Sequence, residues 1–185
     1  MRYKKIFPHI FFVVLVSVFV FLNNSNLKQN KVIQSPQAKN QTSSAKETVQ
    51  VLRVIDGDTI EVSLKNKKET IRLIGIDAPE TVDPRKPVQC FGKEASDKAS
   101  VLLTGKTIIL EPDSTQGERD KYGRLLRYVF LDGLNFNKLM ISKGFAHEYT
   151  YQNNPYKYME EFKNAEKKAR EGKIGLWSEN SKCYN

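Results

Sequence analysis

The chain has 185 residues and carries 30 Lys and Arg against 21 Asp and Glu, which gives a formal net charge of +9. Such a charge suggests an anionic partner, either nucleic acid or an acidic membrane surface. Residues 1–47 hold 7 basic residues and 1 acidic residue, so residues 48–185 carry an excess of only +3. Two Cys and two His, of which His9 lies in the leader, exclude a four-thiolate zinc site and a two-histidine metal site in the folded region.

The first 22 residues combine a basic start at 2–5 with a stretch at 10–22 that is apolar except for Ser17. This pattern is typical of a secretory signal peptide, but its length also approaches that of a transmembrane helix, so cleavage and retention as an N-terminal anchor both remain open. Lys4 and Lys5 favour export of the rest of the chain, and we expect an extracytoplasmic protein, secreted or anchored. Residues 23–47 are rich in Asn, Gln, Ser and Lys, which predicts a flexible linker.

Residues 48–180 are predicted to form one domain, followed by a C-terminal tail at 181–185. Alternating apolar residues and turn signals predict strands at 48–55, 59–64 and 70–76, a helix at 92–104, strands at 107–111 and 124–131, and helices at 135–143 and 155–171. Short strands with early tight hairpins favour an α+β fold built on a five-stranded oligonucleotide-binding (OB) type of barrel with appended helices. An open antiparallel sheet is the alternative.

Three acidic residues lie at predicted strand ends. Asp58 opens the second strand, Asp77 ends the third, and Glu80 follows three residues later. In a meander, the start of the second strand and the end of the third lie at the same end of the sheet, so the first two carboxylates can converge. Converging carboxylates repel each other unless a cation lies between them, and hard oxygen ligands favour Ca²⁺ or Mg²⁺. Ordinary turn chemistry at these positions is the alternative interpretation.

Two arginines suggest what such a site could do. Arg72 lies inside an otherwise apolar strand and Arg124 at a loop-to-strand junction. Each by itself reads as a solvent-facing charge. Two guanidinium groups, a divalent cation and a carboxylate would together cleave a phosphodiester, because the cationic groups stabilise charge developing on phosphorus. Glu80 could then position or deprotonate a water molecule.

Four segments resemble the staphylococcal nuclease (thermonuclease) family: Val-Ile-Asp-Gly-Asp-Thr at 54–59, Arg-Leu-Ile-Gly-Ile-Asp-Ala-Pro-Glu-Thr at 72–81, Asp-Lys-Tyr-Gly-Arg at 120–124 and Gly-Leu-Trp at 175–177. The resemblance covers about residues 48–180. It implies an OB-type barrel with three helices and a Ca²⁺-dependent phosphodiesterase that acts on DNA and RNA and leaves 3′-phosphates. Mg²⁺ or Mn²⁺ replaces Ca²⁺ in some members.

The resemblance also implies roles for individual residues. Asp58 and Asp77 look like the calcium carboxylates, and Ala78 matches a position that contributes its backbone carbonyl, where the family often has Thr. The three residues that look catalytic are Arg72, Glu80 and Arg124.

Four more residues match substrate-binding positions. Lys121 and Tyr122 look like the pair that contacts a terminal phosphate, and Tyr149 and Tyr151 match aromatic positions that flank a nucleotide. An extended segment would place both tyrosines on one face, where a base could stack on them. Packing at the barrel edge is the alternative for either ring.

Cys90 and Cys183 depart from the family pattern, since the best-known member lacks cysteine. In an exported protein, two cysteines favour one disulfide, and closing a loop of this length stabilises the fold by roughly 4–5 kcal/mol in the chain-entropy model. Two free thiols are the alternative.

The sequence therefore predicts an exported, monomeric, metal-dependent nuclease that acts on single-stranded or accessible duplex DNA and RNA. The first alternative is a catalytically inactive OB-fold module that binds nucleic acid or protein at the cell surface, against which the complete set of acidic and Arg positions argues. The second alternative is an anchored interaction protein, held at the membrane by an uncleaved leader, whose basic tail does the work.

Overall fold

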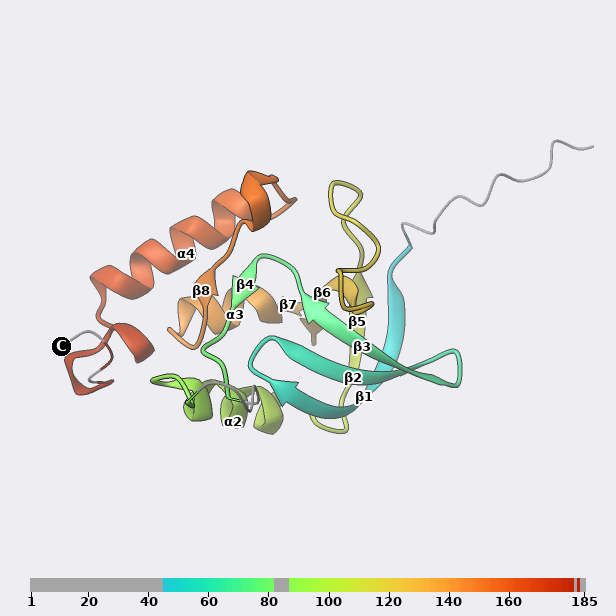
Figure 1. Ribbon diagram of the computed structural model, residues 1–185, viewed down its shortest axis with the longest axis horizontal. Coiled ribbons are helices and arrows are strands. Elements are labelled where there is room, and N and C mark those ends of the chain that lie inside the picture. The colour runs from blue at the N-terminus through green and yellow to red at the C-terminus, as the bar shows by residue number, and fades with distance from the viewer. Residues whose placement is uncertain (1–44, 82–86, 182, 184–185) are drawn as a thin grey trace, which may run out of the picture. The chain divides into compact units, whose positions relative to one another are not determined.

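The computed structural model describes residues 45–81, 87–181 and 183 (Figure 1), all within the compact unit Thr42–Asn185. The predicted leader at 1–22 and nearly all of the predicted linker at 23–47 lie outside the described residues. Within the described ranges, no helix is long and apolar enough to cross a membrane.

Five strands form a closed barrel. β1 (Glu47–Asp56), β2 (Thr59–Leu64) and β3 (Lys67–Leu73) make an antiparallel meander, and β5 (Thr107–Glu111) pairs with β1 on its other side. β6 (Leu125–Leu131) is antiparallel to β5 and parallel to β3, and this last pairing closes the sheet. The predicted α+β fold with an OB-type barrel is therefore confirmed, and the open antiparallel sheet is wrong.

The barrel core follows from alternation along the strands. Successive side chains of a strand point to opposite faces, so every second residue can face the interior. The fully buried residues at alternate positions of the barrel strands are Val49, Val51, Ile60, Val62, Ile71, Leu73, Ile108 and Leu110. Since β-branched residues suit a pleated, buried surface, these strands form where the sequence pattern predicts them.

Three α-helices of the described part pack on the barrel. α2 (Gly92–Leu103) buries Ala95, Ala99 and Leu103 and lies below the barrel in Figure 1, whereas α3 (Phe136–Ser142) and α4 (Met159–Glu171) pack on each other. α4 begins four residues later than predicted. The later start comes from a tertiary contact. Tyr156 is buried and its hydroxyl donates to Glu148 Oε1 at 2.9 Å, so the chain before Met159 is held outside the helix.

The third strand ends earlier than predicted, so its extension to residue 76 is wrong. The Ile74 N–H donates to Arg127 O on β6, and Gly75 adopts a φ of +76°. An added Cβ at Gly75 would lie 2.6 Å from the ring of Tyr156, so this bend requires glycine.

The bend starts a second, two-stranded sheet that the sequence pattern does not predict. β4 (Ile76–Asp77) pairs with β8 (His147–Glu148), which brings the chain before Tyr149 beside the predicted site. The other short elements without a prediction are β7 (Leu134–Asn135) and the 3₁₀ helices η1 (Tyr151–Asn153), η2 (Gly175–Trp177) and η3 (Glu179–Ser181).

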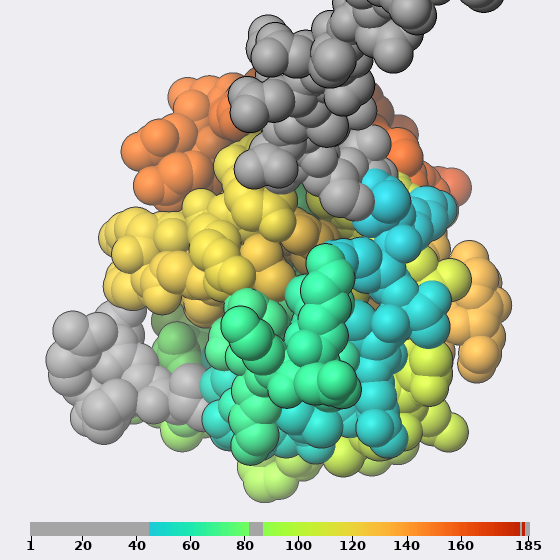
Figure 2. All heavy atoms as spheres, turned by 90° about the vertical axis from the view of Figure 1, so that its right-hand side faces the viewer, coloured from blue at the N-terminus to red at the C-terminus, as the bar shows by residue number. Residues whose placement is uncertain are grey.

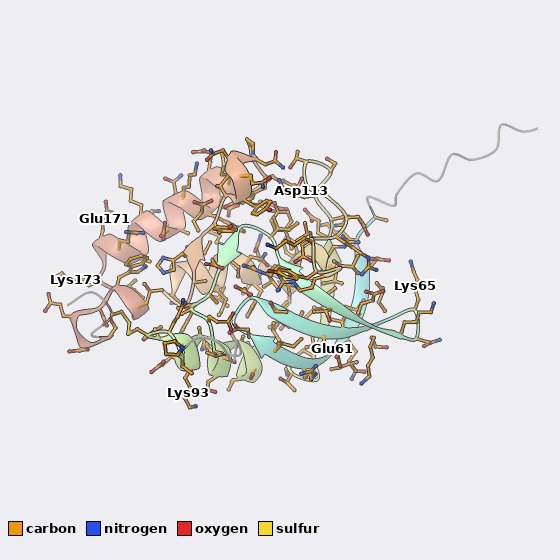
Figure 3. All side chains as sticks on the ribbon, in the orientation of Figure 1. Glu61, Lys65, Lys93, Asp113, Glu171 and Lys173 are labelled. Atoms are coloured by element: carbon orange, nitrogen blue, oxygen red, sulfur yellow. A yellow bond between two sulfur atoms is a disulfide. The ribbon has the colours of Figure 1, made fainter. Side chains whose placement is uncertain are left out.

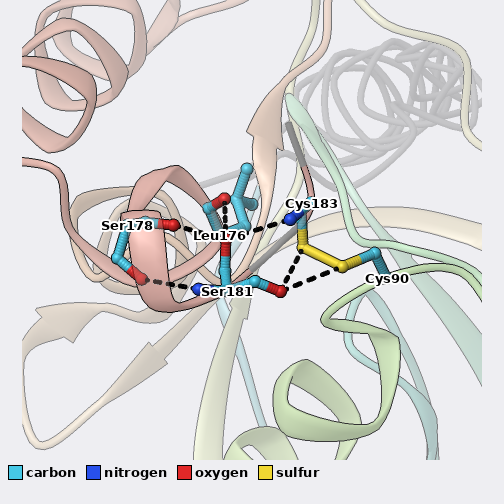
Figure 4. The surroundings of a disulfide bond; sticks show 5 residues. All are labelled: Cys90, Leu176, Ser178, Ser181 and Cys183. Atoms are coloured by element: carbon cyan, nitrogen blue, oxygen red, sulfur yellow. Dashed lines mark hydrogen bonds between the residues drawn. A yellow bond between two sulfur atoms is a disulfide. The ribbon is translucent and has the colours of Figure 1, made fainter. Parts of the chain in front are cut away.

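A disulfide joins Cys90 to Cys183 (Figure 4), which spans 93 positions of the chain. It attaches the predicted C-terminal tail to the segment just before α2. The pairing expected for an exported chain is thus present, and the alternative of two free thiols does not describe this structure.

The polar loop at 112–124 lies against the β2–β3 hairpin. Both guanidinium nitrogens Nη1 and Nη2 of Arg119 donate to the carboxylate of Glu69 on β3, at 2.9 and 3.0 Å. Figure 2 shows the loop, in yellow, directly above the hairpin, in green. Figure 3 labels Asp113 at the base of this loop, near the start of α4.

Candidate active site

The carboxylates of Asp58 and Asp77 converge on one guanidinium group. Asp58 lies in the turn between β1 and β2, and Asp77 is the last residue of β4. Arg72 on β3 places its Nη2 3.2 Å from Asp58 Oδ2 and 3.0 Å from Asp77 Oδ1. The folded chain therefore brings together three predicted site residues from three different segments.

Main-chain groups also fix Arg72. Its Nη1 donates to the carbonyl oxygens of Leu73 at 2.9 Å and Ile76 at 2.7 Å, which lie on either side of the bend after β3. The side chain is only 14% exposed, so the interpretation of Arg72 as a solvent-facing charge is wrong. Because charge-assisted bonds are strong and directional, the bend sets the position of this guanidinium.

The turn that carries Asp58 packs tightly against the chain after β4. Asp58 Oδ2 accepts a 2.8 Å hydrogen bond from the Ala78 N–H, and Oδ1 accepts a 2.9 Å bond from Thr59 Oγ1. An added Cβ at Gly57 would lie 2.6 Å from the Cβ of Ala78. The Asp-Gly-Asp sequence therefore needs glycine here because the chain after β4 approaches so closely.

The donor atoms at this point suit a hard cation. Desolvation raises the pKa of Asp77 although its side chain stays half exposed, Arg72 opposes that rise and Asp58 adds to it. No cluster of three or more His, Cys, Asp or Glu side chains able to hold a metal exists in the described part of the chain. The predicted set needs only two carboxylates and the Ala78 carbonyl, and two carboxylates that converge on one cationic nitrogen fit a divalent ion.

Asp56 and Glu80 form a second acidic pair beside Asp58 and Asp77. The pKa of Asp56 is raised to about 6, chiefly because the carboxyl group is buried; the bond from the Gly57 N–H opposes this rise, and the neighbouring Asp58 and Glu80 add to it. Thr81 Oγ1 also donates to Asp56, at 3.2 Å. No role was assigned to Asp56 from the sequence. Its place two positions before Asp58, across one glycine, is the signal that could have identified it.

Arg124 is clamped by Asp120, to which the sequence assigned no role. Arg124 Nε donates to Asp120 Oδ2 at 2.6 Å, while Oδ1 accepts the N–H groups of Arg124 and Tyr122 at 3.0 and 2.9 Å. Burial would raise the pKa of Asp120, but these bonds outweigh it and lower the pKa. Arg124 Nη1 reaches Thr59 Oγ1 at 3.4 Å, so this arginine approaches the Asp58 turn from the loop side.

A cavity of about 640 Å³ opens between the barrel and the 112–124 loop. Seven predicted site residues line it, namely Arg72, Asp77, Lys121, Tyr122, Arg124, Tyr149 and Tyr151. Asp58, Ala78 and Glu80 are not among the described lining residues. Ala78 instead lines a smaller cavity of about 260 Å³ with Asp77, Gln89, Cys90 and Cys183.

Three exposed aromatic rings border the larger cavity. The ring centres of Tyr149 and Tyr151 lie 6.3 Å apart, and the two side chains are partly exposed, so barrel-edge packing does not account for them fully. Tyr122 is 71% exposed, with Lys121 Nζ 5.0 Å and the Arg124 guanidinium 5.3 Å from its ring centre. Rings and cations together suit a partner that has flat bases and anionic phosphates.

A barrel of the OB type, with two arginines and two converging carboxylates beside a cavity, is the arrangement expected of a protein that cleaves phosphodiesters. A family model described as staphylococcal nuclease homologue matches residues 70–179. A thermonuclease of Staphylococcus hyicus is 39% identical over 90% of this chain and 95% of its own length. The endonuclease YncB of Bacillus subtilis is 38% identical over 82% of this chain and 70% of its own, and a thermonuclease of Staphylococcus intermedius is 37% identical over 89% and 90%.

The chain therefore belongs to the staphylococcal nuclease family. Membership places it among nucleases, which hydrolyse nucleic acids.

Proposed function

We propose that this protein is a Ca²⁺-dependent endonuclease that hydrolyses DNA and RNA to 3′-phosphate products. The observation that carries the proposal is the convergence of Arg72 with Asp58 and Asp77 beside a cavity that Arg124 also lines. The nuclease names of the related proteins support it. Mg²⁺ or Mn²⁺ could take the place of Ca²⁺, as it does in some members of the family.

Asp58, Asp77 and the carbonyl of Ala78 would hold the cation. When bound, the ion supplies positive charge against the negative charge that develops on the phosphate during cleavage. The Ala78 N–H and Thr59 hydroxyl already hold the Asp58 carboxylate in place. Little rearrangement of this residue is then needed for binding.

Arg72 and Arg124 would bind the non-bridging oxygens of the scissile phosphate. A guanidinium group can donate to two oxygens at once, and its electrostatic attraction to the phosphate becomes stronger as water leaves the site. Asp120 fixes Arg124 through Nε and Nη1 contacts Thr59 Oγ1, so the remaining N–H donors of the guanidinium would bind the substrate.

Glu80 would position and deprotonate the attacking water. The water oxygen bonds to phosphorus while its proton passes to Glu80, the bond from phosphorus to the 5′ oxygen breaks, and that oxygen takes up a proton from solvent as it leaves. The phosphate therefore stays on the 3′ side of the cut.

Lys121 and Tyr122 would contact a terminal phosphate, while bases would stack on Tyr149 and Tyr151. Stacking on an aromatic ring contributes about 1–3 kcal/mol per base and tolerates any base. A site that binds phosphate and stacks bases reads little sequence, so we propose broad activity on single strands and accessible duplexes.

We further propose that the protein works outside the cytoplasm, secreted or anchored by its N-terminal segment. The disulfide supports this location, because disulfides persist in oxidising compartments.

The test uses the full chain with denatured DNA, in Ca²⁺ or with a chelator of Ca²⁺. We expect cleavage only with Ca²⁺, and a loss of at least about 100-fold in kcat for Glu80→Gln, because general-base catalysis contributes that much or more. Glu94→Gln, on the exposed surface of α2, is the matched control.

Other outcomes would favour the alternatives. Tight DNA binding without turnover in Ca²⁺ would support the inactive binding module. Loss of function on deletion of residues 23–44 would support the basic tail as the active part, and cleavage that survives the deletion would contradict it.

A further inference from the structure

Glu80 is held through its backbone by one residue, Gln89. The Glu80 N–H donates to Gln89 Oε1 at 2.8 Å, and the Gln89 N–H donates to Glu80 O at 2.9 Å. The two bonds form a bridge between the two ends of the chain segment from 80 to 89. A displacement of Gln89 would therefore strain or break the bonds that hold the main chain of Glu80.

Gln89 in turn is tied to the start of α2. Its carbonyl accepts a 3.0 Å bond from the Gly92 N–H, at the first residue of that helix. An added Cβ at Gly92 would lie 3.1 Å from the carbonyl oxygens of both Glu80 and Pro79, so the helix start presses directly on the Glu80 segment. α2 itself is immobilised by its buried face against β1.

The neighbour of Gln89 is Cys90, and its disulfide leads to the C-terminal segment (Figure 4). There the Cys183 N–H donates to Ser181 Oγ at 3.3 Å, and the Ser181 hydroxyl lies within donating distance of the carbonyl oxygens of Ser178, at 2.6 Å, and Leu176, at 2.9 Å. The Leu176 N–H reaches back to Gly144 O at 2.8 Å, just after α3. The disulfide thus connects the Gln89–Cys90 segment to a C-terminal hook, the described residues 175–181 and Cys183, that is bonded to the body of the domain.

We propose that Gln89 is a positioning residue for Glu80, and that the Cys90–Cys183 disulfide acts on the reaction by holding Gln89. The inference rests on the proposed role of Glu80. Hydrogen bonds at an exposed position are individually modest, so a second constraint is needed to keep this bridge closed. Gln89, Cys90 and Cys183 line the same small cavity as Asp77 and Ala78, which places this constraint directly behind the predicted cation ligands.

The first test separates positioning from stability through the acceptor atom of residue 89. Gln89→Met keeps the length of the side chain but removes the acceptor, whereas Gln89→Glu keeps an acceptor oxygen. Because small misplacements of a catalytic group are costly, we expect Gln89→Met to lower kcat about tenfold with little change in KM. We expect Gln89→Glu to stay within about threefold of the parent, since it can still accept the Glu80 N–H.

The matched control is Val88→Ala, an exposed neighbour that should cleave at the parent rate. Thermal unfolding of each variant is measured in parallel, and rates are compared well below the lowest midpoint. A Gln89→Met protein with unchanged kcat overturns the inference, as does an equal loss in Gln89→Met and Gln89→Glu. If the parent itself does not cleave, the proposed function fails instead.

The second test asks whether the disulfide acts through Gln89. Replacing both cysteines by serine should lower kcat, and adding Gln89→Met to that variant should cost little more, because changes that act through one shared contact are not additive. If the kcat losses of the two changes multiply in the combined variant, the disulfide and Gln89 act independently, and the proposed link between them is wrong. A cysteine-free variant that melts earlier but keeps the parent kcat would also contradict the link.

Discussion

The two sides of the candidate site are built differently. On the barrel side, Asp58 and Arg72 are largely buried and are held by main-chain groups at the bend after β3 and by the close contact of Gly57 with Ala78. On the loop side, Arg124 is more exposed and depends on one carboxylate, Asp120. Main-chain contacts in a core cannot move separately, whereas a partly exposed ion pair can break and reform more easily. We infer that the barrel side fixes the reaction geometry and that the loop side adapts to the substrate.

The largest expected effect is on the barrel side, from Arg72→Lys. Lysine keeps the charge but cannot contact two carboxylates and two carbonyls together, so we expect kcat/KM to fall at least about 100-fold. The measurement is DNA cleavage in Ca²⁺, with circular dichroism to verify folding. Arg53→Lys, an exposed partner of Glu61, is the control and should retain activity. Retained activity in Arg72→Lys would remove the distinction between the two sides.

Gly57→Ala tests the close packing on which the barrel side depends. The new Cβ would meet Ala78 at 2.6 Å, so the Asp58 turn must shift, and we expect a loss of about 1–3 kcal/mol in the free energy of unfolding. Gly117→Ala is the control, because its added Cβ would lie no closer than 3.5 Å to a neighbouring atom. Denaturant unfolding measures both, and equal losses would contradict the packing argument.

Asp120→Asn tests the loop side. The amide keeps one acceptor oxygen but loses the charge that holds Arg124, and we expect about a tenfold fall in kcat/KM. The fall should be smaller than that of Arg72→Lys. An equal or larger fall in kcat/KM would mean that catalysis depends on the loop side at least as strongly as on the barrel side.

The smallest expected effect concerns acid stability at the base of the loop (Figure 3). Burial would raise the pKa of Asp113, but bonds from the Lys157 N–H, the Tyr128 hydroxyl and Thr115 outweigh it and lower the pKa. A lowered folded pKa stabilises the protein above the unfolded pKa, and this stabilisation is lost as pH falls through the folded value. We therefore expect the free energy of unfolding to decrease below about pH 4.

Asp113→Asn should reduce that decrease by about 1 kcal/mol, measured by urea unfolding at pH 7 and pH 3. Asp132→Asn, in the turn after β6, is the control and should behave as the parent. A parent whose stability does not change with acid would contradict the assignment to Asp113.

Much of the barrel could be predicted because its strands alternate every second residue, as at Ile60, Val62, Ile71 and Leu73. The early end of β3 could not, because Gly75 turns only where β6 and Tyr156 meet it. The short β4–β8 sheet was missed for the same reason. Two paired residues on each strand give no periodic signal, and their pairing joins segments about 70 positions apart.

The candidate site divides in the same way. Asp58 and Asp77 were accessible to sequence reasoning because they were predicted at strand ends that a meander brings together, and Arg72 because it is a charge inside an otherwise apolar strand. Asp120 and Gln89 were missed, since the function of each appears only through a bond to another residue of the site.

The net charge of +9 illustrates what the sequence determines and what the tertiary structure determines. By itself the sequence determined the family, the barrel and the location of the charge, because motifs, alternation and composition are all local in the chain. Only the tertiary structure decided how Arg72 and Arg124 face the cavity and how the Cys90–Cys183 disulfide anchors the segment that holds Glu80. Those arrangements depend on contacts between distant segments, and such contacts exist only once the barrel has closed.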